Sequence, residues 1–133
     1  STLRTNNVLI LDWWGSVLNN TGATCSISLR FKYGTTQMIA TEVVIATGAA
    51  REGWSGRFYL KGDGSVSAQE AGLFTHTLDS GVGGANTFST IEGTAAISSD
   101  SNQTLLMSAS IGSTNANLTY IQKMSVITFY PNM

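Results

Sequence analysis

Hydrophobic and polar residues alternate along most of this chain with a period of two. The clearest case is residues 25–33, where apolar positions from Cys25 to Tyr33 alternate with serine, arginine and lysine. Such alternation is typical of a β-strand that has one face against a core and the other in water. No stretch sustains the i, i+3, i+4, i+7 apolar spacing of an amphipathic helix. The pattern therefore predicts an all-β chain.

Turn-forming residues divide the alternating stretches into eight predicted strands. The run Gly62-Asp63-Gly64-Ser65 is a clear example, because glycine readily supplies the positive φ angles of a tight hairpin. The strands are predicted at residues 8–18, 24–33, 37–46, 54–61, 66–76, 88–98, 103–111 and 118–130. Eight short strands at this spacing predict an antiparallel two-sheet β-sandwich that is jelly-roll-like.

The first and last predicted strands differ from the others, because both of their faces are apolar. In the first strand one face holds Leu9, Leu11, Trp13 and Val17, and the other holds Val8, Ile10, Trp14 and Leu18. In the last strand one face is predicted to hold Leu118, Tyr120, Met124, Val126 and Tyr130, and the other Ile121, Ile127 and Phe129.

A sandwich strand with one solvated face should not be apolar on both faces, so a second surface is expected over these strands. Two explanations stay open. The strand ends lie beneath loops, or the outer faces form a subunit interface. The residues predicted for such an interface are Ile10, Trp14, Leu18, Ile121, Ile127 and Phe129.

The length of 133 residues predicts a single domain over residues 1–133. The first residue is Ser1 rather than methionine, so either an initiator was trimmed or the chain is a fragment of a longer one. Charged residues make up only 11%, and polarity comes from sixteen serines and seventeen threonines. A net charge of −1 argues against nucleic acid as a partner. The longest apolar run has four residues, which argues against membrane insertion.

Few side chains here could carry catalysis or hold a metal. Cys25 and His76 are the only residues of their kinds, so no internal disulfide, cysteine metal cage or histidine-rich site is expected, and no cofactor is predicted. Asp79 lies near His76 in sequence, but nothing pairs them with a nucleophile. The carboxylates are scattered singly, without the paired arrangement of a glycosidase. The chain is therefore predicted not to be an enzyme, and a small hydrolase built on His76 is the weakest hypothesis.

Aromatic side chains are the remaining candidates for ligand contact. Trp14 and Tyr59 fall on faces that the alternation places outward, with Asp12 and Arg57 near them in the same strands. Sugar-binding modules stack pyranose rings on such aromatics and flank them with polar groups. A ligand platform of Trp14, Arg57 and Tyr59 is one interpretation. Protein interfaces use large aromatics equally, so the interface interpretation stays open beside it.

The order of several motifs resembles a known type of protein. The opening Thr2–Ile10 is followed by Trp14-Gly15, by Thr21-Gly22-Ala23 and by the stretch Ser28–Gly34. Later stretches of similar character are Ala95–Ile97, Gln103–Leu105 and Met124–Ile127. Together these resemble a β-sandwich module of virion proteins in tailed bacteriophages. The resemblance rests on turn placement and strand register and covers most of the chain.

This resemblance implies a non-enzymatic virion structural protein that decorates the capsid or belongs to a tail appendage. It implies a homo-oligomer, with a trimer favoured, other virion proteins as partners and a place on the extracellular particle surface. The alternative is a carbohydrate-binding or host-receptor-binding module, whose partner would be a cell-surface glycan. The oligomeric state distinguishes these two hypotheses, because a virion protein should be a tight oligomer and a carbohydrate-binding module a monomer with a groove.

Overall fold

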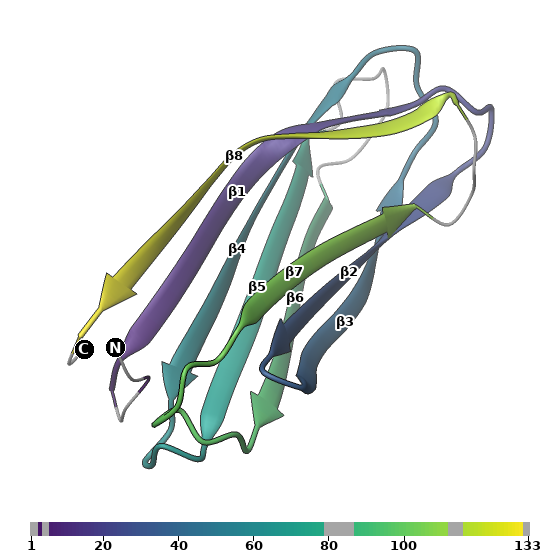
Figure 1. Ribbon diagram of the computed structural model, residues 1–133. Helices are drawn as coiled ribbons and strands as arrows, with labels where there is room; N and C mark the ends of the chain where they lie inside the picture. The colour runs from purple at the N-terminus through teal and green to yellow at the C-terminus, as the bar shows by residue number, and fades with distance from the viewer. Residues whose placement is uncertain (1–2, 4–5, 79–86, 112–115, 132–133) are drawn as a thin grey trace.

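The chain folds as an all-β protein, whose computed structural model describes residues 3, 6–78, 87–111 and 116–131 (Figure 1). These residues form eight strands and no helix. The strands are β1 (Val8–Asn19), β2 (Cys25–Tyr33), β3 (Thr36–Ile45), β4 (Glu52–Gly62), β5 (Gln69–Leu78), β6 (Thr87–Ala95), β7 (Leu105–Ile111) and β8 (Leu118–Tyr130). All eight predicted strands are confirmed, and none of their ends differs by more than three residues.

The strands form two antiparallel sheets, which confirms the predicted β-sandwich. The larger sheet has five strands in the order β6-β5-β4-β1-β8, and the smaller sheet has three in the order β3-β2-β7. The first strand thus pairs with the last, and the second with the second-last, which is the nested pairing that makes the sandwich jelly-roll-like. Val8 lies opposite Tyr130, so the start of β1 and the end of β8 lie side by side (Figure 1).

The hydrophobic core lies between the two sheets and is built around aromatic side chains. Phe31 on β2 stacks on Phe58 on β4, with ring centroids 4.5 Å apart and planes 5° from parallel. Trp13 on β1 packs against Phe31, with centroids 5.7 Å apart. The Trp13 ring lies directly over Gly56, where any larger side chain would collide with it. This close packing fixes β2 over β4 and β1, with β7 next to it.

One side of the sandwich is closed and the other is open. On the closed side β3 lies against β6 and β5. There Gly93 on β6 meets the backbone of Met38 on β3 so closely that a Cβ atom would collide with the Met38 carbonyl oxygen. On the other side β7 and β8 are both edge strands, and they do not pair in the described part of the chain (Figure 1). The inner side of β8 therefore lacks a covering strand in its second half, whereas Leu118 and Tyr120 in its first half pack on the core.

A β-bulge interrupts the pairing of β1 with β8. Trp14 lies opposite Met124 and Gly15 lies opposite Gln122, so Lys123 is an extra residue in β8. An extra residue reverses the alternation of faces beyond it, because side chains in a strand alternate with a period of two. Residues 118–122 therefore follow one alternation and residues 124–130 follow the opposite one.

The predicted division of the last strand into two faces is wrong for this reason. Ile127 lies opposite the core residue Leu11, and Phe129 lies opposite Leu9, so both point to the inner side of the sheet. They do not share a face with Ile121, as the unbroken alternation had predicted. The outer face of β8 instead carries Ile121, Met124, Val126 and Tyr130.

Candidate functional site

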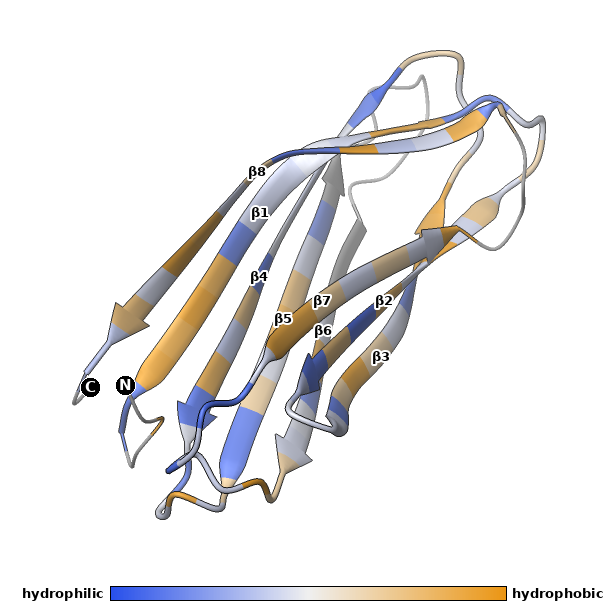
Figure 2. Ribbon diagram, viewed as in Figure 1, coloured by the Kyte–Doolittle hydropathy of each residue, from blue (hydrophilic) through white to orange (hydrophobic). Residues whose placement is uncertain are grey.

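The outer faces of the two sheets have different chemistry. The three-stranded sheet presents mainly serine and charged residues, among them Ser28, Arg30 and Lys32 on β2, and its exposed large apolar residues are Val44 and Leu106. The five-stranded sheet presents large apolar side chains, and six of them are exposed: Trp14, Phe74, Ile121, Met124, Val126 and Tyr130. Figure 2 shows the apolar segments of β1 and β8 side by side near the chain ends. Isolated exposed apolar residues are ordinary, whereas large contiguous apolar patches are typical of interaction sites.

The open side of the sandwich adds a second apolar surface, which we call the open seam. It consists of the inner-facing side chains of the two edge strands: Ile127 and Phe129 on β8, and Leu105, Met107 and Ile111 on β7. Ile127 is 63% exposed, and the three β7 residues are half-buried. A cavity of about 300 Å³ beside Phe129 is bordered by Leu9, Tyr33 and the segment 99–103. The core is thus incompletely covered along this side.

The six predicted interface residues fall on these two surfaces. Ile10, Trp14, Leu18 and Ile121 lie on the outer face of β1 and β8, where Ile10 and Leu18 are half-buried and the other two are exposed. Ile127 and Phe129 belong to the open seam. All six are on the neighbouring strands β1 and β8, although on two surfaces rather than on the single outer face that was predicted. Their role as an interface stays a prediction.

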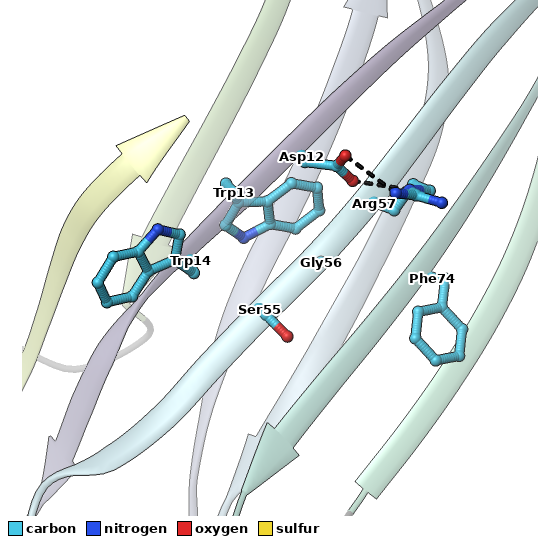
Figure 3. Close-up of a pocket in the computed structure, with 7 residues that line it drawn as sticks. All are labelled: Asp12, Trp13, Trp14, Ser55, Gly56, Arg57 and Phe74. Atoms are coloured by element: carbon cyan, nitrogen blue, oxygen red, sulfur yellow. Dashed lines mark hydrogen bonds and ion pairs between the residues drawn. The ribbon is translucent and has the colours of Figure 1, made fainter. Parts of the chain in front are cut away.

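A groove of about 530 Å³ lies on the outer face of the five-stranded sheet, over β1, β4 and β5 (Figure 3). Its exposed borders are Trp14 on β1 and Phe74 on β5, with the small residues Ser55 and Gly56 of β4 between them. The register explains the hollow, because Ser55 pairs with Trp14 on one side and with His76 on the other. A short side chain between two large neighbours leaves a depression in the sheet surface.

An ion pair forms the polar part of this groove. Arg57 donates two hydrogen bonds to Asp12, from Nε to Oδ1 at 2.7 Å and from Nη2 to Oδ2 at 3.0 Å (Figure 3). These hydrogen bonds, together with the charge of Asp12, raise the pKa of Arg57. Both side chains remain substantially exposed, so the pair adds little to stability and leaves polar atoms facing solvent.

The bulge residue Lys123 lies next to the groove. Its Nζ is 5.8 Å from the centroid of the Trp14 ring, within the range of a cation–π contact. Lys123 comes from β8, which flanks β1 on the side away from β4. The contact helps to hold the indole in place from that side.

The predicted ligand platform is brought together only in part. Trp14 and Arg57 both border the groove, but Tyr59 lies across Gly72 and is not part of it. The sequence interpretation missed Phe74 and Ser55. The signal that could have placed Phe74 on the outer face was the period-two alternation along β5, where it follows Glu70 and Gly72. Glycine in the middle of this run weakened the alternation.

The described residues show no arrangement that supports a catalytic or metal site. His76 is half-buried beside Ser55, while Asp79, its suggested partner, lies outside the described residues. In the described part of the chain, no cluster of three or more His, Cys, Asp and Glu residues could bind a metal. These same residues include no helix able to span a membrane. The absence of enzymatic activity stays a prediction.

In comparisons with known proteins, no family model, no curated protein and no solved structure matches this chain. The likeness to bacteriophage virion modules therefore remains a prediction from the sequence.

Proposed function

We propose that this domain is a non-enzymatic structural protein that assembles into a homo-oligomer through β8. The observation that carries the proposal is that β8 exposes apolar side chains on both of its faces and has one edge that pairs with no other described strand. Following the sequence resemblance, the assembly is a trimer on the surface of a bacteriophage virion, where other virion proteins are its neighbours.

The half of the β8 edge that follows Lys123 lacks the features that keep edge strands from pairing. Natural edge strands are usually short, charged, interrupted by proline or twisted by a bulge. β8 has 13 residues, and its bulge and its only charged residue, Lys123, lie near the middle. The half from Met124 to Tyr130 is uncharged and holds no proline, since Pro131 follows the strand. This half supports pairing with, or burial against, another copy of the chain.

The apolar surface of β8 is large enough to matter energetically. Full burial of a large aliphatic side chain is worth about 1.5–3 kcal/mol. Ile127 is 63% exposed, so covering it contributes about 1–2 kcal/mol for each copy. Phe129 beside it and Met124 and Val126 on the outer face add to this. Rotational symmetry repeats every such contact, so a closed ring of copies uses the same patch several times.

The virion setting is supported by the resemblance and by the composition. A chain rich in serine and threonine, poor in charge and with a single cysteine suits a particle surface, where stability must come from packing rather than from disulfides. An antibody raised against the domain should label the surface of intact particles that carry it. Labelling that requires disruption of the particles would contradict the surface location.

The assembly is tested by placing a charge on β8. Ile127→Asp puts a carboxylate into the proposed interface, where a buried unpaired charge is costly. The side chain is mostly exposed in the single chain, so this variant should still fold. The matched control is Ser28→Asp, which adds the same charge on the polar face of β2. The molar mass of each protein is measured by light scattering and by sedimentation from 1 to 100 µM.

The parent and Ser28→Asp should form the same oligomer. Ile127→Asp should dissociate at least tenfold more readily, with an unchanged β-sheet circular dichroism spectrum. An Ile127→Asp variant that assembles like the parent would place the interface elsewhere. A parent protein that stays monomeric at 100 µM would refute assembly through β8 altogether.

A further inference from the structure

We propose that the groove between Trp14 and Phe74 on the five-stranded sheet binds a neutral saccharide. This second site shares only Trp14 with the predicted interface residues. It is centred on β4, which is separated from the unpaired β8 edge by β1, so pairing along that edge leaves the centre of the groove open.

The apolar borders of the groove suit the carbon–hydrogen faces of a sugar ring. Trp14 and Phe74 are 45% and 41% exposed, and they flank a floor made of Ser55 and Gly56. The volume of about 530 Å³ is that of a site for a small ligand rather than for a packed side chain. Two aromatic rings on either side of a small-residue floor let an extended ligand contact one ring with each of two sugar units.

The polar groups of the groove suit hydroxyl groups. Arg57 uses two of its five N–H donors on Asp12, which leaves three that bind no side chain among the described residues. Asp12 has lone pairs left to accept hydrogen bonds, and the Ser55 hydroxyl group can donate or accept. Neighbouring sugar hydroxyls, which both donate and accept, match this combination. Because the two side chains already hold each other, little conformational entropy is lost when a ligand binds them.

The charge balance within the groove favours a neutral ligand over an anionic one, since the further cation Lys123 contacts Trp14 from β8, on the side of β1 away from β4. The positive charge of Arg57 is compensated at hydrogen-bond distance by Asp12. A carboxylate or phosphate would have to compete with Asp12 for the guanidinium group. A neutral polyol can bind both members of the pair without separating them.

The test uses hexasaccharides of glucose, mannose, galactose and N-acetylglucosamine as neutral probes and hexagalacturonate as the anionic probe. Binding is measured by calorimetry and by tryptophan fluorescence. The fluorescence change reports on Trp14, because Trp13 and Trp54 are 2% and 1% exposed in the core. The variants are Trp14→Ala, Phe74→Ala and Arg57→Ala, and the control is Tyr59→Phe, on the same face but outside the groove.

At least one neutral probe should bind, and each of the three groove variants should bind it at least tenfold more weakly. Tyr59→Phe should bind like the parent. Ile127→Asp should also bind like the parent even as a monomer, so failure of one proposal is distinguishable from failure of the other. The proposal is overturned if no neutral probe binds at 10 mM, if hexagalacturonate binds more tightly than the neutral probes, or if Trp14→Ala and Phe74→Ala keep full affinity while folded.

Discussion

The close contact between β3 and β6 gives the sharpest test of how the two sheets pack. Gly93 lies opposite Ala71 on the core face of the larger sheet. Replacing glycine by alanine inside a strand usually stabilises a protein by about 0.5–1 kcal/mol, because glycine loses more backbone entropy on folding. In Gly93→Ala the new Cβ atom would collide with the Met38 carbonyl oxygen, so the effect should have the opposite sign.

The loss of unfolding free energy in Gly93→Ala depends on which part of the structure must move to make room for the new Cβ atom. The obstacle is backbone, and β3 is held to β2 along its whole length, so the two sheets must separate locally. Overpacking of this kind costs about 1–3 kcal/mol. We place it near the upper end because no side chain can rotate away. After subtraction of the usual gain, Gly93→Ala should lose about 2 kcal/mol of unfolding free energy, or about 8 °C in Tm for a domain of this size.

Gly72→Ala is the matched control, since Gly72 lies next to Ala71 on the opposite face of β5. Its obstacle is the ring of Tyr59, a side chain on the outer surface that can rotate. This variant should stay within about 1 kcal/mol of the parent. Urea unfolding is followed by tryptophan fluorescence at one protein concentration, because assembly would change the apparent stability. A Gly93→Ala variant as stable as the parent would show that β6 does not approach β3 at this point.

Two further predictions concern the core. Phe58→Ala should lower the unfolding free energy by about 3–5 kcal/mol, because Phe58 is fully buried and stacks on Phe31 across the sheets. Phe58→Leu should lower the unfolding free energy clearly less than Phe58→Ala does. Equal losses for the two variants, measured by calorimetry, would contradict a stabilising role of the ring stacking. Burial raises the pKa values of Tyr33 and Tyr120, partly opposed at Tyr33 by a hydrogen bond with Ser99. Unfolded tyrosines release protons first, so the contribution of these two tyrosines to the unfolding free energy should be constant below about pH 10 and be lost above it. Tyr33→Phe/Tyr120→Phe should therefore reduce the fall in unfolding free energy above about pH 10, and an unchanged fall would contradict the assignment.

The strands could be predicted from the sequence because alternation is a local property. Residues 118–130 were predicted with the same bounds that the structure shows. The two faces of that strand could not be assigned, because the extra residue Lys123 is defined only by its pairing with β1. Nothing in the order of the residues marks Lys123 as the bulge.

The candidate groove likewise depends partly on the alternation within single strands, which the sequence shows, and partly on the register between strands, which it does not. Trp14 and Arg57 could be predicted as outward-facing from the alternation of their own strands. The hollow between Trp14 and Phe74 exists because Ser55 lies between Trp14 and His76, and this depends on the registers of β1, β4 and β5 together. Buried Asn19 is a similar case. Its amide group donates to the carbonyl oxygens of Ala23 and Ile45, and only the second of these joins distant parts of the chain.

The open seam and the uncovered half of β8 have one structural origin, which is the unequal size of the sheets. Three strands cannot cover five, so the position of the smaller sheet decides which strand is left uncovered. The contact at Gly93 holds β3 against β6, while Phe31 places β2 over β4 and β1. The smaller sheet therefore ends at β7. β8 extends beyond it, and Ile127 and Phe129 are left uncovered (Figure 1). A smaller sheet shifted toward β8 would bury these residues and leave β6 exposed instead. The glycine on the closed side and the apolar residues on the open side are thus parts of the same arrangement, and the proposed contact with another copy would cover what this arrangement leaves exposed on β8.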